Sequence, residues 1–179
     1  RFDAIASIGM VEHVGLAQID EYAARIAQVL EPGGRVLNHG ITRIPFESDG
    51  AHIGGSFSNR YVFPDGELLN VWRMVQAFER AGFEPLNVEN LHTDYAETLR
   101  HWTVRLDEHI AEAEELGGTE RTRVWRLYLR AARNAFETAQ NAVVQLLCSA
   151  PLTEGAASAP TGERHEAARR RVPPVRVPA

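Results

Sequence analysis

Runs of apolar residues predict four buried β-strands along the chain. The first run, residues 4–8, contains small and β-branched side chains and stops at Gly9. Short runs of this composition are typical of strands, because β-branched side chains pack well on a pleated surface. The other predicted strands cover residues 35–41, 83–91 and 142–150.

Four longer stretches have the three- and four-residue spacing of apolar positions that is typical of amphipathic helices. They cover residues 16–30, 67–80, 94–116 and 119–140. Because strand, helix and strand follow one another over residues 4–41, we predict a βαβ unit with two parallel strands. The pattern as a whole predicts an α/β fold.

The helix spacing also predicts which side chains face the core. In the second and fourth helices these are Leu68, Val71, Trp72, Val75 and Phe78, and Val124, Leu127, Tyr128, Ala131, Ala135 and Phe136. The opposite face of the fourth helix carries five arginines, Arg121, Arg123, Arg126, Arg130 and Arg133. We interpret this face as solvated, and a phosphate- or membrane-binding role is the alternative.

Two candidate site residues fall at the carboxyl ends of neighbouring strands. Glu12 closely follows the first strand, and His39 lies near the end of the second. Ligands of open α/β sheets bind outside the carboxyl ends of strands, so the pair marks a candidate site. Glu12 could equally cap the next helix, and His39 could be a structural histidine. We predict no metal site, because the neighbours Glu12 and His13 point apart.

Composition narrows the classes of function. Hydrophobic residues make up 44% and charged residues 24% of the chain, as in a soluble globular protein. No apolar run approaches the roughly 20 residues of a membrane span. The net charge of −5 argues against a general nucleic-acid binder, which needs a basic surface. The 19 basic residues are all arginine, which excludes lysine chemistry. With a single cysteine, Cys148, we expect no internal disulfide and a cytoplasmic location.

Two segments stand outside the periodic pattern. Residues 42–59 are polar and glycine-rich, and a loop of this length inside a domain is commonly functional, so we predict a lid over the site. Residues 151–179 are rich in Pro, Ala and Arg without periodicity, which predicts a disordered tail. The chain enters a core strand directly after Arg1, so we expect a fragment whose preceding part is missing.

Several motifs resemble known enzymes. Two turns, at residues 30–37 and 78–83, resemble those in the second half of a class I S-adenosylmethionine-dependent methyltransferase. A closer resemblance is to the cyclopropane-fatty-acyl-phospholipid synthase and mycolic acid cyclopropane synthase family. It rests on residues 2–15, 61–66 and 94–99 with Trp102. The resemblance implies a Rossmann-like methyltransferase sheet over residues 1–150, truncated on its N-terminal side and with extra C-terminal helices.

The resemblance implies a lipid-modifying enzyme. In this family a methyl group passes from S-adenosylmethionine to the cis double bond of an unsaturated acyl chain of a phospholipid. Bicarbonate then takes the proton whose removal closes a cyclopropane ring. Peripheral contact with phospholipid at the inner membrane surface would follow. The implied bicarbonate ligands are Glu12, His39, the backbone of Ile41, and Tyr95. Ile8 and Gly9 would contact S-adenosylmethionine, and the aromatic residues Phe57, Tyr61 and Phe63 would line the acyl channel.

The resemblance has gaps, and other functions stay open. The glycine-rich loop that holds S-adenosylmethionine would precede Arg1, so we expect this chain to be inactive alone. Ala132 stands at the position of a cysteine that is described as catalytic in the family. Tyr95 also fits the apolar stripe of its helix as a core residue. The alternatives are a small-molecule methyltransferase, in which Glu12 positions the substrate, and a noncatalytic membrane- or partner-binding module. The acyl substrate, ring or methyl branch, and oligomeric state do not follow from the sequence.

Overall fold

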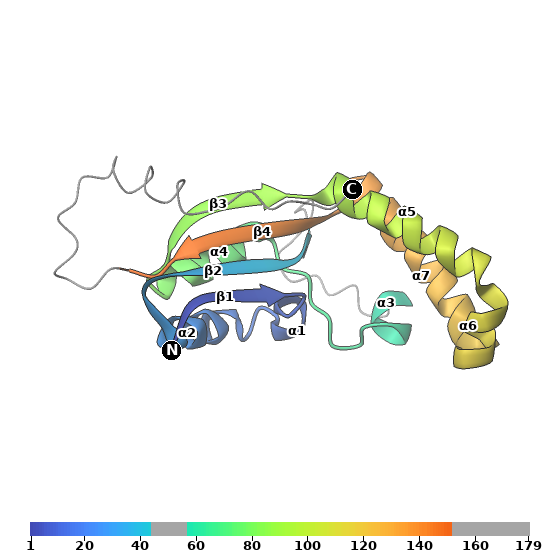
Figure 1. The fold of residues 1–179 in the computed structure, drawn as a ribbon, viewed down its shortest axis with the longest axis horizontal. Helices are drawn as coiled ribbons and strands as arrows, with labels where there is room; N and C mark the ends of the chain where they lie inside the picture. The colour runs from blue at the N-terminus through green and yellow to red at the C-terminus, as the bar shows by residue number, and fades with distance from the viewer. Residues whose placement is uncertain (44–56, 152–179) are drawn as a thin grey trace.

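The computed structural model describes residues 1–43 and 57–151. Its centre is a four-stranded sheet with the strand order β1-β2-β4-β3 (Figure 1). The strands are β1 (Phe2–Ile8), β2 (Leu30–Arg43), β3 (Glu84–Asn90) and β4 (Asn141–Ser149). All four predicted strands are confirmed, and so is the α/β class. Most of the predicted lid, residues 44–56, and the tail after Pro151 lie outside the described residues.

The direction of β4 differs from that of the other strands. β1 and β2 run parallel, with Ile8 beside His39, which confirms the predicted βαβ unit. β4 lies between β2 and β3 and is antiparallel to both. The sequence pattern does not predict this direction. The chain leaves the sheet at the end of β3, passes through the intervening helices and re-enters the sheet at the same end (Figure 1). β4 therefore runs in the opposite direction to β3.

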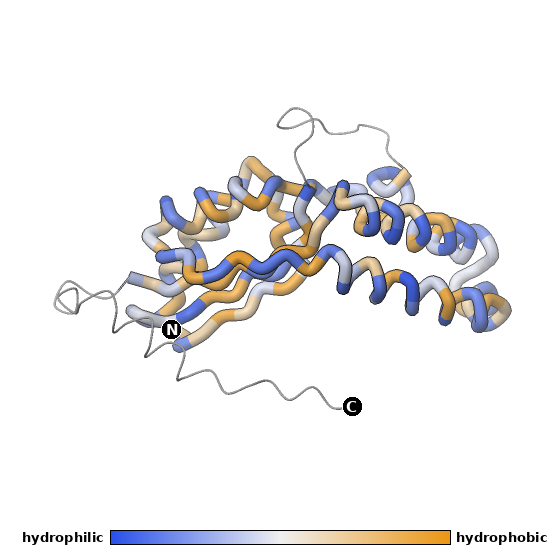
Figure 2. Tube along the Cα trace, turned by 90° about the horizontal axis from the view of Figure 1, so that it is seen from above, coloured by the Kyte–Doolittle hydropathy of each residue, from blue (hydrophilic) through white to orange (hydrophobic). Residues whose placement is uncertain are grey.

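Helices α2 (Ile19–Val29) and α4 (Val71–Arg80) cover one face of the sheet (Figure 2). The two faces of β2 alternate, because successive side chains of a strand point to opposite sides. Val36, Asn38, Gly40 and Thr42 are buried, whereas Leu37, His39 and Ile41, which alternate with them, are half-buried. The main hydrophobic core lies between the helices and the sheet and includes Tyr22, Ile26, Val36, Met74, Phe78 and Leu146.

A buried polar network crosses this core around Asn38, which has no exposed surface. The Tyr22 hydroxyl donates to Asn38 Oδ1 at 2.7 Å and lies 2.6 Å from Ser7 Oγ. Since a hydroxyl has one hydrogen, Ser7 is the donor in the second bond. The Asn38 amide nitrogen lies 3.5 Å from Met74 Sδ. The network satisfies Asn38, whose burial without partners would cost about 1–3 kcal/mol, and it links β1, β2 and both helices.

A helical arm extends from the carboxyl end of the sheet (Figure 1). It consists of α5 (His92–Glu108), α6 (Ile110–Gly117) and α7 (Thr119–Glu137). A second core joins α5, α7 and β4 through Ala96, Leu99, Leu129, Phe136 and Val143. Two short helices, α1 (Val11–Val14) and α3 (Phe57–Tyr61), complete the described structure. No described helix is long and apolar enough to cross a membrane.

The prediction of one helix over residues 94–116 is wrong, because the chain leaves helical geometry at His109 (φ −113°, ψ 30°). The ring Nδ1 of His109 lies 3.0 Å from the carbonyl oxygen of Arg105, which also accepts the His109 N–H. The backbone bond keeps the i→i−4 pattern at this residue, and the predicted single helix is divided here into α5 and α6.

Three predicted core positions are also wrong. Trp72 is 41% exposed, and the Arg73 guanidinium lies over its ring at 3.9 Å from the centroid. Leu127 is 55% exposed and Ala131 is exposed, whereas Leu129 is buried. For Leu127 and Ala131 the reason is that α7 packs mainly on α5 and much less on the sheet, so a different stripe of α7 faces inward.

Candidate active site

The site begins at the turn after β1. Gly9 has a φ of 65°, which favours glycine, and its N–H donates to the His39 carbonyl oxygen at 2.9 Å. The bond fixes the end of β1 beside the end of β2. Helix α1 starts two residues later and carries Glu12. The structure therefore places Glu12 and His39 at one edge of the sheet, as the strand pattern predicts.

The two carboxylate oxygens of Glu12 have different environments. Oε1 accepts a hydrogen bond from the Ile41 N–H at 2.7 Å. Oε2 is buried and has no hydrogen-bond partner among the described residues. The main-chain oxygen of Glu12 accepts the Glu67 N–H at 2.8 Å. The carboxylate is thus held by one oxygen, and its second oxygen is an unused buried acceptor, which a native structure rarely leaves without a partner.

Gly40 allows this close approach of α1 to β2. A Cβ atom at Gly40 would overlap Val11 Cγ1 and would lie 3.4 Å from Glu12 Oε2. The sequence reasoning above assigns no role to Gly40. Its position inside an apolar strand is the available signal, since an isolated glycine in a strand commonly marks a close approach of another segment.

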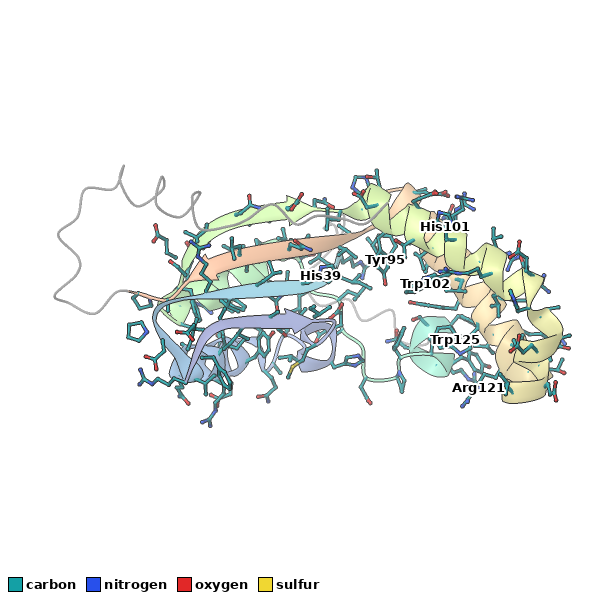
Figure 3. The ribbon with its side chains drawn as sticks, in the orientation of Figure 1. His39, Tyr95, His101, Trp102, Arg121 and Trp125 are labelled. Carbon is teal, nitrogen blue, oxygen red and sulfur yellow. The ribbon has the colours of Figure 1, made fainter. Side chains whose placement is uncertain are left out.

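His39 is half-buried and contacts Gln145 of β4, which lies directly opposite in the sheet. Gln145 Nε2 is 3.2 Å from His39 Nδ1. Figure 3 shows His39 and Tyr95 at the end of the sheet from which the helical arm extends. Gln145 is a second residue that the sequence reasoning missed, because its partner is 106 positions away.

Tyr95 lies in the first turn of α5, and its ring packs on Phe136 at 4.8 Å and on Trp102 at 6.2 Å between centroids. Tyr95 is therefore also a packing residue of the core between α5 and α7. Burial and the negative charge of Glu12 raise the pKa of Tyr95, so its hydroxyl remains protonated and can donate a hydrogen bond.

The two residues predicted to contact S-adenosylmethionine, Ile8 and Gly9, are open to solvent. Ile8 is 69% exposed, and an added Cβ at Gly9 would meet no atom within 4 Å. Both lie at the carboxyl end of β1, where the fold places ligands. Their contact with S-adenosylmethionine stays a prediction.

Aromatic side chains connect α1 with the arm. Phe63 packs against His13, Tyr128 and Trp125, with centroid distances of 6.2, 5.7 and 6.4 Å. Phe63 is thus next to the residue that follows Glu12, as an acyl-channel residue would be. In α3 the rings of Phe57 and Tyr61 are tilted against each other with centroids 5.2 Å apart, and Tyr61 borders a cavity of about 530 Å³ at the start of α7.

The predicted solvated arginine face of α7 is largely a set of exposed ion pairs. Arg126 lies 2.9 Å from Asp107 of α5, and Arg130 contacts the same carboxylate. Arg133 pairs with Glu137 at 2.7 Å. Carboxylates of the chain therefore already balance the charges of these three arginines, which a phosphate or a membrane surface would otherwise bind.

The strand order and the antiparallel β4 define the sheet of a class I methyltransferase. The chain superposes on the cyclopropane synthase MmaA2 from Mycobacterium tuberculosis with a TM-score of 0.76 and 26% identity, over 82% of this chain and 55% of that one. It superposes on the mycolic acid cyclopropane synthase CmaA1, in complex with SAH and CTAB, with a TM-score of 0.75 and 26% identity, over the same shares. The fold class is therefore confirmed.

Within this class the family is also clear. Residues 1–146 match the model of the mycolic acid cyclopropane synthetase family. A probable fatty acid methyltransferase from Pseudomonas putida is 39% identical over 158 residues, 87% of this chain and 40% of the relative. The chain belongs to the mycolic acid cyclopropane synthetase family, which confirms the resemblance. It spans about two fifths of the length of this relative and about half of the matched structures.

A substitution tests the close approach at Gly40. We expect Gly40→Ala to lower the free energy of unfolding by about 1–3 kcal/mol, because the added methyl group overlaps Val11. Urea denaturation followed by circular dichroism measures the change. Gly117→Ala is the control, since it adds the same methyl group where the nearest atom is Arg121 Cδ at 3.8 Å. Equal effects of the two substitutions would contradict close packing at Gly40.

Tyr128 gives a prediction for alkaline pH. Burial and, to a smaller extent, Tyr95 raise the pKa of Tyr128 to about 12 in the folded chain, whereas an unfolded tyrosine has a pKa of about 10. Above pH 10 the unfolded state therefore loses this proton first, and the stabilisation present below pH 10 disappears as the pH approaches 12. Between pH 10 and 12 the free energy of unfolding should fall with pH in both proteins. We expect this fall to be less steep in Tyr128→Phe than in the unmodified chain, by about 1.4 kcal/mol per pH unit. Identical pH profiles for the two proteins, measured by urea denaturation, would show that Tyr128 does not titrate in this way.

Proposed function

We propose that this chain forms the bicarbonate- and acyl-binding part of an S-adenosylmethionine-dependent methyltransferase. The substrate would be the cis double bond of an unsaturated phospholipid acyl chain, and the product a cyclopropane ring or a methyl branch. The observation that carries the proposal is the Glu12 carboxylate, which is anchored at Oε1 and whose buried Oε2 has no partner in the part of the chain that the structure describes. The name of the P. putida relative, a probable fatty acid methyltransferase, supports the acyl substrate.

The residues around Glu12 fit bicarbonate, which carries both a hydroxyl donor and acceptor oxygens. Glu12 Oε2 would accept the bicarbonate O–H. Tyr95 and His39 would donate to its other oxygens, and the raised pKa of Tyr95 keeps that hydroxyl protonated. The Ile41 N–H already donates to Glu12 Oε1, so we assign Ile41 the role of anchoring Glu12.

The remaining parts of the site would hold the two reactants apart from water. Bound S-adenosylmethionine would supply an electrophilic methyl group at the carboxyl end of β1, beside Ile8 and Gly9. Phe63, Trp125 and Tyr128 would give the acyl chain an apolar wall leading toward Glu12. An alkene is a weak nucleophile, so it must be held close to the methyl group and kept dry. Peripheral contact with a phospholipid surface would deliver such a chain.

Replacing one carboxylate tests the proposal. In the full-length natural protein we expect Glu12→Gln to lower methyl transfer to vesicles of unsaturated phospholipid by about 100-fold, because an amide nitrogen at Oε2 cannot accept the bicarbonate hydrogen. Transfer of a radiolabelled methyl group from S-adenosylmethionine is measured across a bicarbonate titration. The 179-residue chain alone is expected to show no steady turnover.

Glu97→Gln is the matched control, because Glu97 is an exposed carboxylate of α5 that pairs with Arg100. It should keep full activity and the full response to bicarbonate. Full activity of Glu12→Gln without a bicarbonate response in either protein would overturn the bicarbonate site. Transfer to a small molecule but not to phospholipid would indicate a small-molecule methyltransferase instead.

A further inference from the structure

Gln145 and His39 face each other across the centre of the sheet. They are paired in the antiparallel ladder of β2 and β4, so their side chains lie on the same face. Gln145 Nε2 lies 3.2 Å from His39 Nδ1, and both residues are half-buried. The opposite face carries α4, which Asn38 of β2 contacts through Met74. The Gln145 amide therefore reaches the imidazole from the side of the sheet that α2 and α4 leave uncovered.

The orientation of the Gln145 amide sets which ring nitrogen of His39 carries the hydrogen. In the structure the NH₂ group of Gln145, which is only a donor, lies toward the ring, and with this orientation His39 Nδ1 is the acceptor. A neutral imidazole with Nδ1 as acceptor carries its hydrogen on Nε2. His39 Nε2 makes no hydrogen bond within residues 1–43 and 57–151, so this N–H is available to a ligand.

We propose that Gln145 is a positioning residue that holds His39 as a neutral Nε2–H donor for the anion bound beside Glu12. The inference rests on the proposed function for the identity of that anion. The backbone of His39 is held as well, because its carbonyl oxygen accepts the Gly9 N–H at 2.9 Å. The imidazole is then fixed in both place and tautomer. Glu12 supplies the acceptor of the site and His39 a donor.

Two substitutions separate this role from simple packing. Gln145→Glu keeps the shape of the side chain but presents only acceptors, so it should draw the proton to Nδ1 or onto both nitrogens. Gln145→Leu removes the hydrogen bond and should leave a mixture of the two tautomers. A packing role alone would affect stability in both variants without a change of tautomer.

The tautomer is measured by two-bond ¹H–¹⁵N correlation spectra of the 179-residue chain with labelled histidine. The His39 signals are assigned by their loss in His39→Gln. We expect Nε2–H in the unmodified chain and the stated changes in the two variants. Nδ1–H in the unmodified chain, or one unchanged tautomer in all three proteins, would overturn the proposal. Gln76→Glu and Gln76→Leu on α4 are controls that should leave the His39 signals unchanged.

Kinetics in the full-length natural protein test the link to the anion. We expect both Gln145 variants to lower kcat and to raise the half-saturating bicarbonate concentration by about tenfold to a hundredfold, by analogy with the loss seen when a group that orients a metal-bound histidine is removed. A changed tautomer with an unchanged bicarbonate response would overturn the positioning role. If Glu12→Gln still abolishes that response, the proposed function survives; if it has no effect either, the proposed function itself fails.

Discussion

The hydrogen bond from the Ile41 N–H to Glu12 Oε1 is the interaction on which the site depends. It joins the helix after β1 to the last residues of β2 at 2.7 Å, and it leaves Oε2 buried without a hydrogen-bond partner in residues 1–43 and 57–151. The bond requires α1 to lie against the strand, which Gly40 permits because it has no side chain. It also requires the sharp turn at Gly9. Two glycines and one backbone amide thus fix the orientation of the carboxylate.

The helical arm completes the site from the other side. The chain leaves the sheet after β3 and returns as β4, which pairs with β2 in the opposite direction. This reversal places Gln145 opposite His39, and Tyr95 lies in the first turn of the arm, where burial and the charge of Glu12 raise its pKa. The second core, around Leu99, Leu129 and Phe136, keeps the arm against the end of the sheet. The fold of the arm and the composition of the site are therefore coupled.

Local patterns in the sequence were sufficient to predict the strands and to predict that Glu12 and His39 lie at the same edge of the sheet. Both follow from apolar runs and from the rule that parallel strands share one carboxyl edge. The division at His109 was not predictable from periodicity, since the apolar spacing continues across it through Leu106 and Ile110. The exposure of Leu127 depends on which surface α7 meets. Gln145 was missed because its pairing with His39 depends on a strand register set by the whole intervening chain.

The proposed bicarbonate ligand has to be compatible with the negative charge of Glu12. A buried carboxylate oxygen beside an anion would repel it unless a proton lies between them. If the ligand is an anion, Glu12 would therefore accept one that brings its own hydroxyl, as bicarbonate does, and would disfavour fully deprotonated carbonate. Tyr95 and His39 are neutral donors in the proposed arrangement, so neither would neutralise the ligand in the way that a cation would. Hydrogen bonds from neutral groups would hold the anion in place and leave it basic, which is the property that removal of a proton from the alkylated chain requires.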